Sequence, residues 1–129
     1  MRQRARDGGG FEEAAAYSRA IRHGSIVAVS GTTCSPDDAV PPDDSYLQAK
    51  AAIRRALAAA ERLGATRHDV IRTRLLLAPG CDWEAVARAH REEFEHVQPA
   101  NTTFYVGGLV PAGVLVEVEL DAVVEEPPR

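Results

Sequence analysis

Residues 114–124 read VLVEVELDAVV, and this stretch constrains the fold more than any other part of the chain. Every second residue from Val114 to Val124 is apolar, so a β-strand places all of them on one face. The residues between them put Glu117, Glu119 and Asp121 on the other face. We therefore expect a strand whose apolar face packs under helices, while its acidic face meets water or a second layer such as another subunit.

Two helices are predicted to cover that apolar face. The first is capped by one of residues 43–45 and ends near Leu63, since Gly64 supplies a stop. Its apolar positions recur at helical spacing and form a stripe of Ile53, Leu57, Ala60 and Leu63. The second helix is capped by Asp82 and ends before Pro99, with one face carrying Trp83, Val86, Ala87, His90 and Phe94.

Further strands are predicted over residues 16–22, 25–30, 70–77 and 102–106. His23-Gly24 forms the turn between the first two strands, because glycine adopts positive φ without steric cost. The order is ββαβαββ, which defines an α+β protein whose sheet is covered on one face by two helices. Residues 1–10 are expected to be a flexible N-terminus, and residues 11–129 a single domain.

Composition narrows the class of protein. The net charge of −4 disfavours nucleic-acid binding, and we expect no such partner. Neither a run of about 20 apolar residues nor a secretory signal occurs, so we expect a cytoplasmic protein without a membrane partner. Two cysteines and four dispersed histidines show no metal-ligand spacing, which predicts free thiols and no metal.

An ordered set of short motifs resembles the Rid (YjgF) family. The motifs run from about Tyr17 to Val124 and cover most of the chain. They are Tyr17, the Gly24-Ser25 turn, Val29-Ser30-Gly31, Gly64 followed by Asp69-Val70-Ile71-Arg72-Thr73, Pro99-Ala100, and Val116-Glu117-Val118-Glu119.

The resemblance implies a chorismate-mutase-like fold. It also implies a homotrimer whose sheets form a central barrel, with small-molecule clefts between subunits. The best-known members hydrolyse reactive imines and enamines without a metal or cofactor. An arginine clamps the substrate carboxylate in that chemistry, and a glutamate positions or activates water.

By this resemblance Glu117 is the candidate general base, and Tyr17, Ser30 and Gly31 line the cleft. Other roles are open for these residues. The acidic row could simply pair with Arg72 and Arg74 across neighbouring strands. Tyr17 could instead be an interface aromatic, and Ser30 could simply end a strand. Cys34 lies in a loop expected to border the cleft, but an incidental thiol is the favoured interpretation.

One position departs from the deaminase pattern. Asn101 follows Pro99-Ala100 where the deaminases have their arginine, and Asn101 and Thr103 are the substrate-binding candidates in this segment. Three explanations are open. The substrate could be an uncharged imine, enamine or carbonyl compound; the protein could bind a metabolite without chemistry; or another cation could replace the arginine, for which Arg74 is the candidate.

The sequence therefore predicts a small-molecule enzyme of imine, enamine or related carbonyl chemistry with an altered substrate anchor. The alternative is a metabolite-binding or regulatory trimer without turnover. RNA cleavage, also linked to this family, receives little support from the acidic charge balance.

Overall fold

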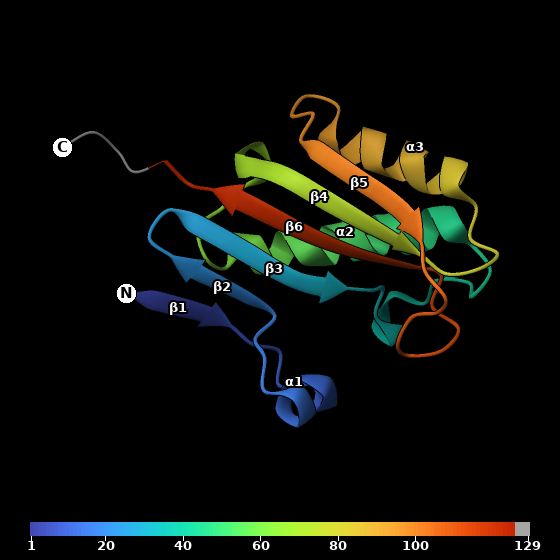
Figure 1. Ribbon diagram of the computed structural model, residues 1–129, viewed down its shortest axis with the longest axis horizontal. Coiled ribbons are helices and arrows are strands. Elements are labelled where there is room, and N and C mark those ends of the chain that lie inside the picture. The colour runs from blue at the N-terminus through green and yellow to red at the C-terminus, as the bar shows by residue number, and fades with distance from the viewer. Residues whose placement is uncertain (126–129) are drawn as a thin grey trace.

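The computed structural model describes residues 1–125, which form a six-stranded sheet with two long helices (Figure 1). The strands are β1 (Arg2–Ala5), β2 (Ala20–His23), β3 (Ile26–Thr32), β4 (Val70–Leu77), β5 (Ala100–Tyr105) and β6 (Val116–Val123). The helices are α1 (Gly10–Ala15), α2 (Ser45–Glu61) and α3 (Trp83–Phe94), with short 3₁₀ turns at Pro36–Asp38 and Arg67–Asp69.

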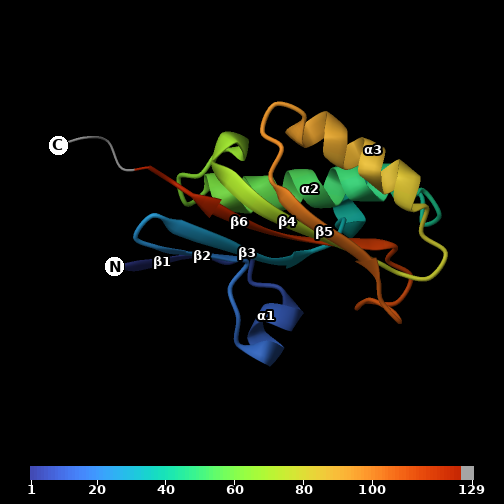
Figure 2. The ribbon, with the colours of Figure 1, turned by 45° about the horizontal axis from the view of Figure 1, so that its top comes forward.

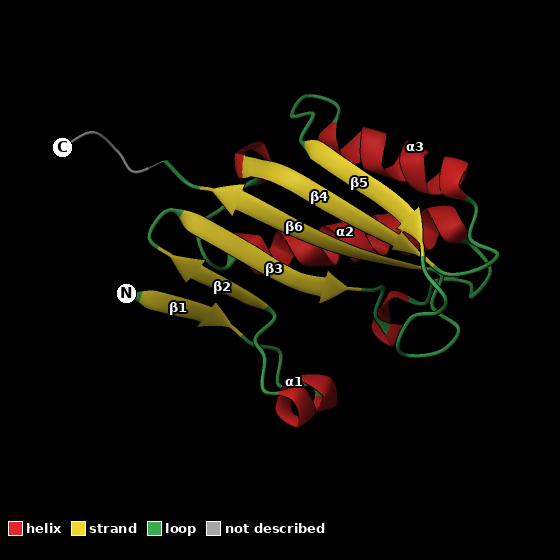
Figure 3. Cartoon of the chain, viewed as in Figure 1, coloured by secondary structure: helices red, strands yellow, loops and turns green. Residues whose placement is uncertain are grey.

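The strand order in the sheet is β1-β2-β3-β6-β4-β5 (Figure 3). Neighbouring strands are antiparallel except β4 and β5, which run parallel because α3 connects them. Helices α2 and α3 cover one face of the sheet, whereas α1 lies at its end, away from them (Figure 2). The predicted α+β class and the two-helix layer are confirmed.

The core forms between β6 and the helices, as the alternation in residues 114–124 predicts. Val116, Val118, Leu120 and Ala122 are each 0% exposed. From α2 the predicted stripe is buried as well: Ile53, Leu57, Ala60 and Leu63. Trp83, which was placed on the buried face of the second helix, is instead 55% exposed at the first residue of α3.

The helix boundaries follow from local chemistry. The side chain of Asp44 accepts a hydrogen bond from the Leu47 N–H, and that of Asp82 accepts from the Glu84 and Ala85 N–H groups. Both are N-caps that satisfy backbone donors of the first helical turn. Gly64 has a φ of 90°, as the predicted stop after α2 requires.

The N-terminal region differs from the prediction. Residues 2–5, expected to be flexible, form strand β1 and pair with β2 from Arg2↔His23 to Ala5↔Ala20. The strand predicted from residue 16 begins only at Ala20, because residues 10–15 are helical. Residues 2–5 read RQRA and lack the apolar alternation by which strands are recognised in a sequence. Backbone hydrogen bonds to β2 on one side hold this edge strand in place.

Candidate active site

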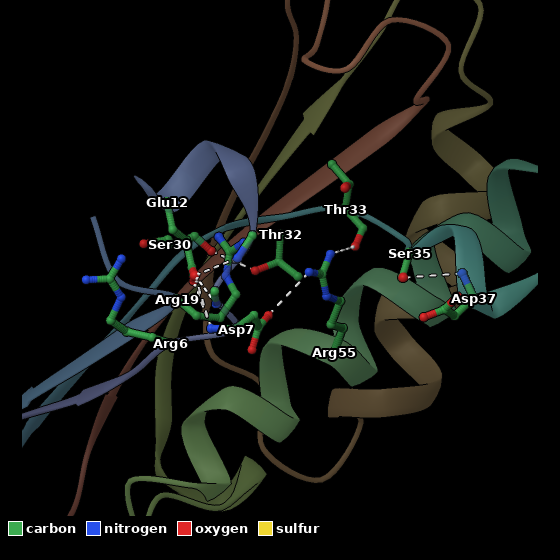
Figure 4. Close-up of polar contacts among 12 residues, drawn as sticks. Arg6, Asp7, Glu12, Arg19, Ser30, Thr32, Thr33, Ser35, Asp37 and Arg55 are labelled. Carbon is green, nitrogen blue, oxygen red and sulfur yellow. Dashed lines mark hydrogen bonds and ion pairs between the residues drawn. The ribbon is translucent and has the colours of Figure 1, made fainter. Parts of the chain in front are cut away.

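A cleft of about 720 Å³ opens between α1, the segment that follows β3, and β6. It contains side chains from parts of the chain that are more than 80 residues apart. The residues that line it include Glu12, Tyr17, Arg19, Ser30, Gly31, Cys34, Arg55 and Glu117. Figure 4 shows the polar contacts along one side of this region.

A β-bulge at the end of β3 shapes the cleft. Val29 pairs with Leu120 of β6, but the next paired residue, Thr32, faces Val118, so the register shifts in between. The Ser30 N–H donates instead to the Arg19 carbonyl oxygen at 2.9 Å, and the Ser30 hydroxyl donates to the Ser18 carbonyl oxygen at 2.7 Å. The bulge thereby ties residues 18–19 to Ser30 and Gly31, and bulges of this kind commonly redirect side chains next to active sites.

Gly31 makes room for the Glu117 carboxylate. A Cβ atom built on Gly31 would lie 1.9 Å from Glu117 Oε1, far inside van der Waals contact. The carboxylate therefore rests directly against the Gly31 backbone, a position that any larger residue would close. Because of this close contact, Gly31 of β3 and Glu117 of β6 belong to one site.

Glu117 is half-buried, and its electrostatic surroundings suit a base. Burial raises the pKa of its carboxyl above the ordinary value, and the negative charge of Glu119 raises it further. The positive charge of Arg19 acts in the opposite direction. A carboxylate with a raised pKa holds a transferred proton more readily, which is what general-base chemistry requires.

Arg19 is the most unusual side chain in the cleft. It is only 7% exposed, and its Nη2 group donates to the Gly31 carbonyl oxygen at 2.5 Å. Its Nε–H group has no hydrogen-bond partner among residues 1–125. The guanidinium carbon lies 5.7 Å from the centroid of the Tyr17 ring, within the range of a cation–π contact.

Glu12 anchors the wall of the cleft that α1 forms. The carboxylate accepts backbone hydrogen bonds from Asp7, Gly8 and Gly9, the shortest being 2.6 Å from Gly8 N. Burial opposes ionisation of Glu12, but these backbone donors hold its pKa below the ordinary value. The run of glycines at residues 8–10 is thus fixed by one buried carboxylate.

Arg55 of α2 completes that side of the cleft. Its Nη1 group donates to the Thr33 carbonyl oxygen at 3.1 Å, and its Nη2 group contacts Asp7 Oδ2 at 3.3 Å (Figure 4). The charge of Arg55 is therefore balanced within the chain by Asp7.

Cys34 also lines the cleft, as its position in the sequence suggested. Burial raises the pKa of its thiol above the ordinary value, and nearby Asp38 raises it further. A thiolate is the nucleophilic form of cysteine, so these surroundings do not favour a catalytic role.

The structure brings together four of the predicted site residues: Tyr17, Ser30, Gly31 and Glu117 all line the cleft. Arg74 does not line this cleft, but it lines a neighbouring pocket of about 560 Å³ on the open face of the sheet, which Tyr17 and Ser30 also line. Its Nη1 group lies 3.3 Å from Asp121 Oδ2 and 3.7 Å from Glu119 Oε1. The expected pairing of the acidic row with Arg74 is thus present.

Asn101 and Thr103 lie on the opposite face of the sheet from Glu117. The Asn101 Nδ2 group donates to Thr73 Oγ1 at 3.0 Å, and the Thr103 hydroxyl donates to Asn101 Oδ1 at 2.8 Å. Thr73 is fully buried towards α3, where its Oγ1 lies 2.7 Å from His90 Nε2. Within one chain these two residues of β5 do not meet the cleft.

Sequence reasoning missed Arg19, Glu12 and Arg55 as residues of the site. Arg19 follows Tyr17 by two positions, and a charged residue in the middle of the strand predicted over residues 16–22 was the one available signal. Its guanidinium is buried against the Gly31 carbonyl oxygen, a contact between residues twelve positions apart that the local sequence does not reveal. Similarly, nothing in residues 7–12 shows that one carboxylate binds three successive backbone groups.

Over residues 1–125, no group of three or more His, Cys, Asp or Glu side chains is placed to hold a metal ion. No helix in that range has the length and apolar character needed to span a membrane.

Fold and cleft together define the class of protein. The chain is an α+β protein of the chorismate-mutase-like type, with a cleft suited to a small molecule. A family model described as Endoribonuclease L-PSP matches residues 10–124. The chain therefore belongs to the Endoribonuclease L-PSP family, also called the YjgF or Rid family, and membership supports a role in processing or binding small molecules.

Individual relatives agree with this assignment. The chain is 39% identical to the uncharacterized protein SCO2049 of Streptomyces coelicolor over 93% of this chain and 90% of that protein. The crystal structure of Rv2704 from Mycobacterium tuberculosis, a member of the YjgF/YER057c/UK114 family, has 38% identity and a TM-score of 0.87. That match covers 96% of this chain and all of Rv2704. At 24% identity, the E. coli TdcF structure with bound serine shares the fold, with a TM-score of 0.78.

Proposed function

We propose that this protein hydrolyses an imine, enamine or related carbonyl intermediate, with Glu117 as the general base. The observation that carries the proposal is the half-buried Glu117 carboxylate with a raised pKa, held against Gly31 in a cleft that also contains Tyr17 and Ser30. Addition of water to a protonated imine needs little more than proximity and a base, since the carbon is already electrophilic.

The chemistry balances with Glu117 as the only proton carrier. A water oxygen bonds to the iminium carbon, the C=N electron pair moves to nitrogen, and one water proton passes to Glu117. The carboxyl then returns this proton to nitrogen and takes up the hydroxyl proton as the C–N bond breaks. A carbonyl compound and ammonia leave, and the last proton departs from Glu117.

Ser30 fits a binding role in this scheme better than a nucleophilic one. Its hydroxyl proton is engaged with the Ser18 carbonyl oxygen, which leaves the lone pairs of Oγ to accept a hydrogen bond from substrate. No base contacts Ser30 within the described residues.

We also propose that the working form is a homotrimer. The face of β6 that carries Glu117, Glu119 and Asp121 has no covering layer within residues 1–125, and other copies of the chain would supply one. A contribution from Asn101 or Thr103 to a cleft also requires a second copy, because both lie on the far face of their own sheet.

RNA cleavage, to which the family name refers, is not proposed here. Binding to phosphates requires a concentrated basic surface, and the chain carries a net charge of −4.

The decisive experiment measures ammonia release from freshly generated 2-iminobutyrate. We expect Glu117→Gln to lose roughly 10²–10⁴-fold in rate, the typical contribution of a general base. Glu125→Gln, which changes an exposed side chain two residues beyond β6, should retain activity. Melting shifts with no product in the wild-type protein would instead support the non-catalytic binding trimer.

The pH dependence gives a sharper test of the same residue. A base must be ionised, so the rate should rise with pH through the pKa of Glu117, which lies above its ordinary value. Glu119→Gln removes a negative charge that raises this pKa, and should therefore move the rise to lower pH. An unshifted profile in Glu119→Gln would contradict the assignment of Glu117 as the titrating base.

A further inference from the structure

Arg19 makes no salt bridge among residues 1–125, unlike Arg55 and Arg74, although its charge acts on the nearby Glu117 carboxyl. Arg55 pairs with Asp7, and Arg74 pairs with Glu119 and Asp121. Arg19 makes no ion pair among residues 1–125, although only 7% of its surface is exposed. Its one hydrogen bond goes to a neutral carbonyl oxygen, that of Gly31.

Such an arrangement is costly to the free protein. A guanidinium group cannot lose its proton at any ordinary pH, so burial without a directly bonded carboxylate leaves its charge only partly compensated by Glu117. The unpartnered Nε–H adds a buried donor without an acceptor. A negative charge supplied by a ligand would relieve the charge deficit, and Arg19 lines the cleft where a ligand would enter.

Gly31 places this cation next to the candidate base. The Arg19 Nη2 group bonds to the Gly31 carbonyl oxygen, while Glu117 Oε1 lies where a Gly31 side chain would begin. The two charged groups are thus both against one residue, and yet they form no ion pair with each other among the described residues. The remaining space suits a small ligand that carries a negative and a positive group close together.

We propose that Arg19 binds the carboxylate of a substrate whose protonated imine nitrogen faces Glu117. Arg19 would thus replace the cation that the deaminases carry at the position of Asn101, and the substrate class becomes the small α-imino acids. The part of this inference that concerns the imine rests on the proposed function. Recognition of a carboxylate at Arg19 stands by itself, because it follows from the charge and burial of that side chain.

The Tyr17 ring supports the same role. The guanidinium lies 5.7 Å from the ring centroid, a contact that holds its plane without using its N–H donors. A planar guanidinium held in this way presents its remaining N–H groups to a carboxylate in a fixed geometry. Arg74 cannot serve equally well, since two carboxylates already share its charge.

The first test compares two stable probes with the wild-type protein. One is 2-oxobutyrate, the product of 2-iminobutyrate hydrolysis, and the other is 2-oxobutanamide, which has nearly the same shape but no charge. We expect 2-oxobutyrate to bind at least about tenfold more tightly in calorimetric titration, since hydrogen bonds to charged groups are worth that much. Equal affinity for the two probes would overturn the proposal.

Variants then assign the discrimination to one residue. Arg19→Gln should bind both probes with similar affinity, while Arg19→Lys keeps the charge and should retain part of the preference for 2-oxobutyrate. Arg88→Gln and Arg91→Gln, which change exposed side chains of α3 outside the cleft, are matched controls that should keep the full preference. If Arg19→Gln does not fold, Arg19→Lys and the two controls still decide. Full retention of the preference in Arg19→Gln, or its loss in Arg88→Gln or Arg91→Gln, would refute the assignment.

Failure of this inference and failure of the proposed function give different results. Glu117→Gln should still prefer 2-oxobutyrate while losing turnover. If the protein binds 2-oxobutyrate through Arg19 but never releases ammonia, the carboxylate site is supported and the proposed hydrolase activity is refuted. Turnover of 2-iminobutyrate with an unchanged KM in Arg19→Gln would retain the hydrolase and refute the anion site.

Discussion

At the scale of single residues, Gly31 determines whether the site can exist. Its missing side chain admits the Glu117 carboxylate, and its carbonyl oxygen accepts the hydrogen bond from Arg19. The sequence motif Val29-Ser30-Gly31 marked this position by resemblance. The physical reason for a glycine there became evident only from the position of Glu117.

Gly31→Ala should therefore abolish most activity with little loss of stability. The new Cβ would lie 1.9 Å from Glu117 Oε1, so the carboxylate must swing away, which its flexible side chain permits at modest cost. A displacement of this size is expected to reduce the rate roughly a hundredfold. Gly107→Ala is the matched control, since a Cβ at Gly107 meets nothing within 4 Å.

Rate assays and thermal melting together check this expectation. Gly31→Ala with wild-type activity would show that the position of the Glu117 carboxylate does not matter. A large fall in melting temperature would show instead that Gly31 is needed for folding rather than for the site.

At the scale of elements, a polar network joins β4, β5 and α3. Thr103 orients the Asn101 amide, Asn101 donates to Thr73, and Thr73 contacts His90 Nε2. Because Thr73 Oγ1 accepts from Asn101, its own proton is available for His90 Nε2, which then acts as the acceptor of a neutral imidazole. In this chain Asn101 thus stabilises the packing of the parallel strand pair on α3.

The network predicts a pH-dependent stability. Burial lowers the pKa of His90 in the folded state below its ordinary value. The unfolded chain then binds more protons than the folded chain as the pH falls below the unfolded value of about 6.5, so the free energy of unfolding decreases there. Above that pH the contribution of His90 is complete.

Urea denaturation at several pH values measures this effect. We expect His90→Gln to weaken the loss of stability on acidification, whereas His96→Gln, which alters an exposed side chain, should leave the pH profile unchanged. An identical acid dependence in His90→Gln and in the wild-type protein would contradict a buried neutral imidazole.

At the scale of the whole molecule, one sheet face carries helices and the other is open. Apolar side chains occur on the open face next to the charged row; Ile26 and Ile71 are 56% and 54% exposed, and Phe104 is 44% exposed. β5 is an edge strand with every residue exposed. Edges and faces of this kind are usually covered in functional assemblies.

The proposed trimer makes a simple prediction about mass. Sedimentation equilibrium should give a particle of three chains of 13.9 kDa each. Phe104→Glu places a charge on the open face and should yield smaller particles, whereas Trp83→Glu changes an equally exposed aromatic residue on the helix layer and should not. A wild-type monomer would refute the trimer.

The sequence alone determined those features that depend on local pattern. Alternation in residues 114–124 defined β6 and its two faces. Capping residues located the start of α2 to residues 43–45 and the start of α3 to Asp82, because capping acts within a few residues. The same local motifs carried the resemblance to the family. Only the tertiary structure decided which charges meet.

The buried Arg19 guanidinium contacts the carbonyl oxygen of Gly31, twelve residues away, next to the register shift between β3 and β6. Asn101 and Glu117 are separated because the Asn101 side chain lies on the helix-covered face of the sheet, whereas the Glu117 side chain lies on the open face. Neither is encoded by neighbouring residues. Both features depend on pairing between strands that are far apart in the sequence, and such pairing is defined only in the tertiary structure.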